Sequence, residues 1–232
     1  MSRPVPPDRL DRLVDAATHV FVEQGYRGTQ MADVAEALGV AKGTLYLYVE
    51  SKEALFDLVL RTADAPRPLQ APGPLPVPTP KAGATLRYVR ERLGAGGQLF
   101  ALNGALQRKR TGDARAELES ICAEIYGVLA RNRHGIKLVD RSARDQPELA
   151  ALWFEGSRGG LVGLLEQYLR RRIAQRALRD VPDVTAAARL VVETLAFWAV
   201  HRHWDSHPQP IRDEVAQTTA VTFIVNALAK EA

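Results

Sequence analysis

The distribution of proline restricts the fold of this chain more than any other feature of its sequence. Seven of the 14 prolines lie within residues 66–80. Each proline removes a backbone hydrogen-bond donor and disfavours helical backbone at the residue before it, so this stretch can be neither a helix nor a central strand. We therefore expect residues 64–80 to be an extended, polyproline-like linker between a domain at 1–63 and a larger domain at 81–232.

Outside the linker, apolar residues recur with the 3.6-residue period of a helix. Residues 8–24 carry one apolar stripe, and Gly25 is expected to close that helix as its C-cap. Further helices are predicted at 81–93, 97–109, 114–131, 147–178, 183–204 and 211–230. No alternating strand pattern stands out, so the predicted fold class is all-α in two unequal parts.

Composition excludes collagen-like, disulfide-scaffold, membrane and wholly disordered proteins. A chain of 232 residues can bury a core without disulfide or metal support, and its 46% hydrophobic and 25% charged residues are ordinary for a globular protein. The single cysteine, Cys122, forms no internal disulfide, which fits a reducing, cytoplasmic setting. No apolar run approaches the roughly 18–20 residues of a membrane span, and the first residues do not resemble a signal peptide.

Net charge does not by itself indicate a nucleic-acid partner. The chain carries +4 overall, but residues 1–60 hold six Lys/Arg against nine Asp/Glu, whereas residues 61–232 hold 25 against 18. A nucleic-acid interpretation must therefore depend on local motifs near the N-terminus rather than on overall basicity.

The residues after the first helix have the spacing of a helix-turn-helix. Thr29 is expected to cap a short helix over 30–37, and a second helix is expected at about 42–48. Ala35, Gly39 and Leu45 stand four and six residues apart. Such a motif needs a small residue where its helices cross, a glycine in the turn and an apolar residue facing back from the second helix.

The second short helix is also suited to the major groove of DNA. Its predicted outer face offers Lys42, Thr44, Leu47 and Tyr48, and Gly43 lets the backbone come close to DNA. Hydroxyl and ammonium groups bind phosphate, while methyl groups contact thymine. A following helix is predicted to begin after Ser51 as its N-cap, where free backbone N–H groups favour a phosphate.

Residues 21–59, which read FVEQGYRGTQMADVAEALGVAKGTLYLYVESKEALFDLV, resemble the TetR family of transcriptional regulators. The resemblance implies an N-terminal three-helix DNA-binding domain and an all-α ligand-binding and dimerisation domain. It also implies a homodimer on a palindromic double-stranded operator, which usually represses transcription until a small molecule binds. The C-terminal part of this family diverges widely, so the resemblance gives no effector.

Carried over by position, the resemblance assigns phosphate contacts to Thr44, Tyr48 and Lys52, and base-edge contacts to residues among Lys42, Gly43, Tyr46 and Leu47. The predicted DNA-binding residues as a whole are Thr29, Lys42, Gly43, Thr44, Tyr46, Leu47, Tyr48 and Lys52. Two positions depart from the family pattern. Many members have Arg where Ala32 stands, which puts base reading from the earlier helix in doubt, and many have Phe where Val49 stands.

Large side chains in the C-terminal part are candidates for lining a ligand pocket, because such sites are mostly apolar with few polar groups. The candidates are Phe100, Tyr126, Trp153, Phe154, Arg158, Phe197, Trp198 and His201. Ordinary core packing is the alternative for each aromatic residue. His203 and His207 have the spacing of two metal ligands, but the helix is expected to end there, so a solvated helix end is the favoured interpretation and neither metal nor cofactor is predicted.

A homodimer is expected to form through the last two long helices, at 183–204 and 211–230, whose small and branched apolar residues suit close packing. An enzyme is the rival class. Gly156-Ser157 lacks the preceding glycine of a nucleophile elbow, since Glu155 stands there, so catalysis is not expected. A ligand-independent DNA-binding dimer and an activator both stay open.

Overall fold

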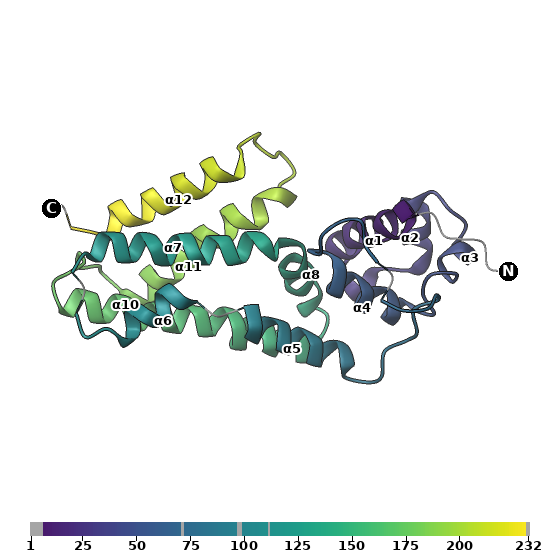
Figure 1. Cartoon of the computed structure of the whole chain (residues 1–232), viewed down its shortest axis with the longest axis horizontal. Helices are drawn as coiled ribbons and strands as arrows, with labels where there is room; N and C mark the ends of the chain where they lie inside the picture. The colour runs from purple at the N-terminus through teal and green to yellow at the C-terminus, as the bar shows by residue number, and fades with distance from the viewer. Residues whose placement is uncertain (1–6, 71, 97–98, 111, 231–232) are drawn as a thin grey trace. The chain divides into compact units, whose positions relative to one another are not determined.

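The computed structural model describes residues 7–70, 72–96, 99–110 and 112–230. Within these ranges the regular elements are helices, as predicted, and extended backbone pairs only at Val49–Val77 and Leu178–Ala229. None of the described helices is long and apolar enough to cross a membrane. The chain forms two compact units (Figure 1): unit 1 comprises Met1–Arg92 and His134–Trp153, and unit 2 comprises Leu93–Arg133 and Phe154–Ala232.

Unit 1 begins with four helices, of which α1 packs against α2 and α4, and α2 packs against α3. These are α1 (Pro7–Gly28), α2 (Met31–Leu38), α3 (Lys42–Leu45) and α4 (Lys52–Thr62). Their core includes Leu13, Val14, Phe21, Val34, Leu45, Val49, Leu55 and Leu58. The Phe56 ring lies 5.1 Å from Phe21 and 4.8 Å from Tyr26 between ring centroids, which joins the end of α1 to α4.

Two glycines and one serine set the boundaries of these helices as the sequence predicts. Gly25 interrupts the helical backbone of α1 with a φ of 78°, and Gly39 ends α2 with a φ of 72°. Both values lie in the left-handed region that glycine adopts at little cost. The Ser51 hydroxyl accepts a hydrogen bond from the Ala54 N–H at 3.1 Å and caps α4.

The expected cap of α2 was wrong by one residue. The N-cap is Gln30, whose N–H donates to the Asp33 carboxylate at 2.8 Å. The Thr29 hydroxyl instead donates to the carbonyl of Gly25 at 2.7 Å. The Gly25 carbonyl therefore accepts from both the N–H of Thr29, at 3.2 Å, and its hydroxyl.

The remaining helices divide between the units. Unit 1 contains most of α5 (Ala84–Gly96) and α8 (Arg133–Ala143), together with α9 (Pro147–Ala150). The predicted boundaries at 63/64 and 80/81 therefore do not coincide with the unit boundaries. One reason lies in α8, where the Arg141 guanidinium donates to the Glu23 carbonyl at 3.3 Å.

Unit 2 is built around α7, which packs against α6, α11 and α12, while α10 packs against α6 and α11. The bounds are α6 (Phe100–Gln107), α7 (Ala114–Arg131), α10 (Gly159–Ala174), α11 (Val184–Ala199), the 3-10 turn η2 (His201–Trp204) and α12 (Asp213–Leu228). The predictions at 114–131, 183–204 and 211–230 match helices closely, and the first two residues of the 97–109 prediction lie outside the described residues.

Two helical predictions were wrong in detail. α8 was not predicted, although Ile136, Val139 and Ala143 have the spacing of one helical face. The single helix expected over 147–178 is divided by the π-helical segment η1 (Ala151–Arg158). Glycines interrupt this stretch, and a Cβ at Gly159 would lie 3.1 Å from the Phe154 carbonyl oxygen, so the wider backbone depends on a small residue there.

Candidate nucleic-acid interface

The surface of α3 and the turn after it presents the side chains that the sequence assigned to base reading. Lys42 and Gly43 are exposed, Tyr46 is 42% exposed and Leu47 is 65% exposed. A Cβ at Gly43 would meet no atom within 4 Å, so the backbone itself is accessible there. This surface offers one ammonium, one phenol, one aliphatic side chain and open backbone.

An apolar frame lies directly beneath that surface. Leu45 and Val49 are fully buried, and Gly39 donates to the Glu36 carbonyl at 3.0 Å in the turn between α2 and α3. Regular helix ends at Leu45 rather than at residue 48, and residues 46–48 form a turn. The recognition segment, which we define as residues 42–48, is therefore one helical turn followed by a tight turn.

The structure contradicts the DNA-contact assignment for Tyr48. Its side chain is only 3% exposed, because the chain leaves helical geometry after Leu45 and Tyr48 turns into the core instead of outward. The prediction extended the helix to residue 48, and such a helix would place the Tyr48 phenol on the outer face. Thr44 is half-buried, and its phosphate contact stays a prediction.

Thr29 is too buried for its predicted DNA contact, and Lys52 makes contacts within the protein that the sequence did not predict. Thr29 is 1% exposed, with its hydroxyl bonded inward as described above. The Lys52 Nζ donates to the carbonyls of Tyr26 and Thr29 at 3.0 Å each, and it lies 4.7 Å from the centroid of the Tyr26 ring. The ammonium thus caps the backbone after α1, because the irregular turn at Gly25 leaves carbonyls there that need donors.

The neighbouring phenol of Tyr26 is held neutral. Burial, followed by the charge of Glu53 and the hydrogen bond to its carboxylate at 3.2 Å, raises the pKa of Tyr26 to about 12. The Lys52 ammonium and the Glu53 carboxylate therefore stabilise the junction of α1 and α4. The sequence did not reveal this role, since all three groups are common surface residues.

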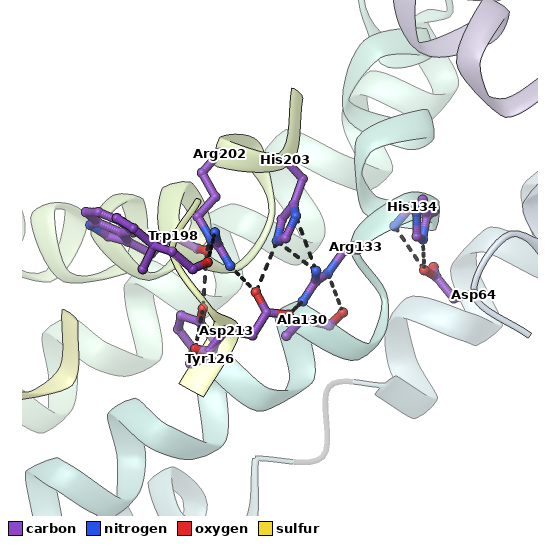
Figure 2. A network of polar contacts seen from close by, with 10 residues as sticks. Asp64, Tyr126, Ala130, Arg133, His134, Trp198, Arg202, His203 and Asp213 are labelled. Carbon is purple, nitrogen blue, oxygen red and sulfur yellow. Dashed lines mark hydrogen bonds and ion pairs between the residues drawn. The ribbon is translucent and has the colours of Figure 1, made fainter. Parts of the chain in front are cut away.

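The described part of the chain contains a second cluster that is built for polar contacts, at the end of α7 and the start of α12 (Figure 2). The Arg133 Nη2 lies 2.6 Å from Asp213 Oδ2, and Arg202 also pairs with Asp213. Burial opposes ionisation of Asp213, but Arg133 and the other cations outweigh it and lower the pKa of Asp213. The Tyr126 hydroxyl donates to the Trp198 carbonyl at 3.2 Å in the same region.

Asp64 makes a separate contact within unit 1, also drawn in Figure 2. Its carboxylate accepts from the N–H groups of His134 at 3.0 Å and Gly135 at 2.7 Å. Asp64 lies just after the end of α4 and therefore caps the first turn of α8. A Cβ at Gly135 would lie 3.1 Å from the carboxylate, so glycine favours this close approach.

The predicted pocket residues are not gathered as expected. Phe100 and Phe197 are exposed, while Trp153 is buried in unit 1, where its indole donates to Asp140 at 2.9 Å. Tyr126 is buried, and Phe154, Trp198 and His201 are half-buried. Arg158 pairs with Glu193 at 2.5 Å on α11. Exposure of the two phenylalanines corrects the prediction for them, because a lining residue is covered by neighbouring side chains.

Unit 1 contains a small cleft that no motif indicated. It holds about 180 Å³ and is lined by α4 residues, by the start of α5 and by Leu149. Phe56, Leu60 and Leu149 give it an apolar floor, and Glu53 and Lys81 lie at its polar side. Ligand sites for drug-sized molecules usually hold about 300–1,000 Å³, so this cleft suits only a smaller molecule. Within the described residues, no group of His, Cys, Asp and Glu is placed to hold a metal ion.

Comparison with known proteins finds a family model that matches the segment containing this surface. The model of bacterial regulatory proteins of the tetR family matches residues 13–59, which contain the recognition segment and its apolar frame. The ketosteroid transcriptional regulator KstR2 of Mycobacterium tuberculosis superposes with a TM-score of 0.56, 18% identity and 98% coverage of both chains. At 18% identity this superposition shows a shared fold, and the family model matches residues 13–59.

Curated relatives match this chain over a short segment. The HTH-type transcriptional repressor KstR2 of Rhodococcus jostii is 42% identical over 53 residues, which are 23% of this chain and 26% of that protein. The HTH-type transcriptional regulator YhgD of Bacillus subtilis is 42% identical over 55 residues, 24% of this chain and 29% of that protein. The chain thus matches about a quarter of the length of these relatives.

Proposed function

We propose that this protein is a DNA-binding transcriptional regulator whose recognition segment enters the major groove. The observation that carries the proposal is the exposed surface of Lys42, Gly43, Tyr46 and Leu47 on a buried frame, inside the segment that the family model matches. Side chains on a rigid frame keep their spacing when they approach base edges. Lys42 and Thr44 suit phosphate, whereas Tyr46 and Leu47 suit base edges and thymine methyl groups.

Fluorescence anisotropy with a labelled duplex tests this assignment. The duplex is first selected from a random pool by the wild-type protein. Leu47→Ala is expected to change the preferred base at one position of each half-site, and Lys42→Ala is expected to weaken binding to all duplexes alike. Glu119→Ala, a change of an exposed residue of α7 in unit 2, serves as the control. Wild-type affinity and base preference in both recognition variants would refute the proposal.

The protein is proposed to act as a homodimer through α11 and α12. The apolar stripe that the sequence assigned to the interface is largely buried within unit 2 instead, as Val192, Leu195 and Val225 illustrate. Large apolar side chains outside that stripe are exposed on the same two helices, namely Leu190, Phe197 and Phe223, and Val215 of the stripe is exposed as well. An exposed apolar surface on adjacent helices marks an interaction site, and two helices from each copy suit a four-helix interface.

A matched pair of phenylalanines tests the interface. Phe223 of α12 is 77% exposed and Phe100 of α6 is 73% exposed, so an arginine costs little folding stability at either position. Phe223→Arg is expected to give monomers at micromolar concentration in analytical ultracentrifugation, whereas Phe100→Arg is expected to stay dimeric. A dimeric Phe223→Arg protein, or a monomeric wild type, would contradict the proposed interface.

Repression relieved by a small molecule is the regulatory mode that we favour. Its support comes from relatives: KstR2 of Rhodococcus jostii is a transcriptional repressor, and IcaR of Staphylococcus aureus is a negative transcriptional regulator. Half-buried Phe154, Trp198 and His201 in unit 2 are the proposed effector contacts. A ligand-independent dimer and an activator are the alternatives.

A reporter placed behind the selected duplex separates these modes. A repressor lowers reporter expression, and an effector found by melting-temperature screening restores it. Raised expression would identify an activator. Repression that no molecule with a melting shift relieves would favour the ligand-independent dimer.

A further inference from the structure

The proline-rich segment is attached to the helix-turn-helix at both of its ends. At the first end, the Arg67 guanidinium binds two carboxylates of α1, with Nη1 3.0 Å from Asp11 Oδ1 and Nη2 2.6 Å from Asp15 Oδ1. The Leu69 N–H also donates to Asp11 at 2.8 Å, and the Leu69 side chain is buried. The predicted linker therefore starts as a docked segment of unit 1.

The second end pairs with the backbone immediately after the recognition segment. The Val77 N–H donates to the Tyr48 carbonyl at 2.7 Å, and the Val77 carbonyl accepts from the Glu50 N–H at 3.0 Å. These two bonds bracket Val49 in a parallel pairing. Residues 48 and 50 are thus held at fixed positions by a segment nearly thirty residues further along the chain.

Thr79 extends this contact to the cap of α4. Its N–H donates to the Glu50 carboxylate at 2.9 Å, and its hydroxyl donates to the Ser51 hydroxyl at 2.9 Å. The Ser51 oxygen in turn accepts from the Ala54 N–H and begins α4. Four hydrogen bonds therefore fasten the short connection between the recognition segment and α4.

The sequence pattern of the segment suits a one-sided contact of this kind. Prolines alternate with other residues from Pro74 to Pro80, so only Leu75, Val77 and Thr79 have N–H groups there. Alternate residues of an extended chain point their N–H groups to the same side. Val77 and Thr79 donate to unit 1 while Pro76 and Pro78 are exposed, and proline also limits the entropy lost when the segment is ordered.

The recognition segment benefits from such support because it contains a single turn of helix. One turn fixes several backbone angles for very few hydrogen bonds, so a helix of this length is not stable by itself. Buried Leu45 and Val49 hold its inner side, and the bonds from Val77 hold its end. The placement of Tyr46 and Leu47 relative to α4 therefore depends on both.

We propose that residues 67–70 and 72–80 are a strap that positions the recognition segment for sequence-specific DNA binding, with Val77 and Thr79 as its positioning residues. This inference rests on the proposed DNA-binding function. The strap itself is proposed to contact no base. It limits the motion of the residues that do, so its loss reduces discrimination between duplexes more than it reduces attraction to phosphate.

Val77→Pro in the full-length protein tests the strap, with Val77→Ala as its matched control. Proline removes the Val77 N–H, whereas alanine keeps both backbone bonds and removes the half-buried side chain. Affinity for the selected duplex is expected to fall about five- to tenfold in Val77→Pro, the effect of about one net hydrogen bond. Affinity for an unrelated duplex of equal length is expected to stay within about twofold, because it depends on phosphate contacts.

Two further measurements separate positioning from simple stability. Hydrogen exchange of the Glu50 amide is expected to accelerate in Val77→Pro but not in Val77→Ala, while the amides of α2 stay unchanged. Thr79→Val, which keeps the N–H and removes the hydroxyl bond to Ser51, is expected to lose about two- to fivefold in discrimination, and Thr79→Ser is expected to restore it.

Three outcomes would overturn the strap. Unchanged discrimination in Val77→Pro would show that the recognition segment needs no support from it. Equal losses for selected and unrelated duplexes, with a lower melting temperature, would reduce the segment to a general stabiliser. Equal effects of proline and alanine would assign the role to the side chain. Failure of the proposed function is seen separately, because the wild-type protein would then select no duplex.

Discussion

The recognition segment and a further ion-pair cluster of unit 2, which we define as Arg108, Glu117 and Arg172, place charge in opposite ways. The recognition segment keeps its polar groups exposed on an apolar frame, and its members lie within seven residues of one another. The cluster buries its charges: Arg172 of α10 is fully buried, and its Nε lies 2.7 Å from Oε1 of Glu117 on α7. A polar change should therefore alter function in the first region and folding in the second.

The cluster satisfies its buried charges in full. The Arg172 Nη2 donates to the Ala105 carbonyl at 2.8 Å and to Glu117 Oε2 at 3.1 Å, and the exposed Arg108 adds a second cation at 3.1 Å from the same oxygen. Burial would raise the pKa of Glu117, but the hydrogen bonds and charges of the two arginines outweigh it, so the pKa lies below its ordinary value. The carboxylate is thus ionised in the folded protein.

The largest effect in this comparison is expected from Arg172→Met. It leaves Glu117 buried with one exposed partner, and breaking a buried pair in this way costs about 3–5 kcal/mol of unfolding free energy. Urea unfolding followed by circular dichroism measures the loss. Arg172→Met combined with Glu117→Leu is expected to recover a large part of it, because both charges are then absent. A double variant less stable than Arg172→Met would contradict this explanation.

Acid should act on the same cluster. A group whose pKa is depressed in the folded state contributes stability above its unfolded pKa and loses it as the pH falls through its folded pKa. For Glu117 the loss begins near the ordinary value of 4.5 and continues below it. The slope of stability against pH in this range is expected to be smaller in Glu117→Gln than in the wild type.

Two glycines of unit 1 give the next largest effect and form a matched pair. Gly25 and Gly39 both have positive φ, but a Cβ at Gly25 would lie 2.6 Å from the Asp145 carboxylate and 2.9 Å from Arg141, whereas Gly39 has open space. Gly39→Ala is expected to cost about 1 kcal/mol from backbone strain alone. Gly25→Ala should cost about 1–2 kcal/mol more, because these side chains must move. Equal melting temperatures for the two variants would contradict this.

A pair of lysines gives the smallest effect and separates framework from surface. Lys52→Met removes the donor to the Tyr26 and Thr29 carbonyls and should lower stability by about 1–2 kcal/mol, with little change in the salt dependence of DNA binding. Lys42→Met should leave stability unchanged and reduce the salt slope by about one unit. The reverse pattern would return Lys52 to the phosphate-binding role that the sequence suggested.

The two regions also differ in how far the sequence predicts them. Gly25, Gly39, Leu45 and Ser51 were placed correctly, because turns and caps depend on neighbours within a few residues. The same local reasoning extended the recognition helix too far and turned Tyr48 outward, because it did not include the pairing of Tyr48 with the strap.

Contacts between distant residues account for the remaining differences. Arg172 is one of three consecutive arginines, Arg170 to Arg172, yet it pairs with Glu117, 55 positions earlier. Pairs at such separation leave no periodic signal. The same applies to α11 and α12, where the pattern predicted the helices but the apolar stripe that it assigned to a dimer is largely buried within unit 2. The prolines correctly excluded helix at 64–80, whereas docking of that segment depends on Asp11, Asp15 and Glu50.

Residues 42–47 are proposed to read DNA sequence from a fixed frame in a symmetric dimer. Selection of duplexes from a random pool by the full-length protein tests it most directly. The expected result is an inverted repeat whose half-site centres lie about one helical turn apart or slightly more. Leu47→Ala should select a repeat of the same spacing with a changed base in each half. Selection of no common sequence, or of an identical repeat by wild type, Leu47→Ala and Tyr46→Ala, would contradict the claim.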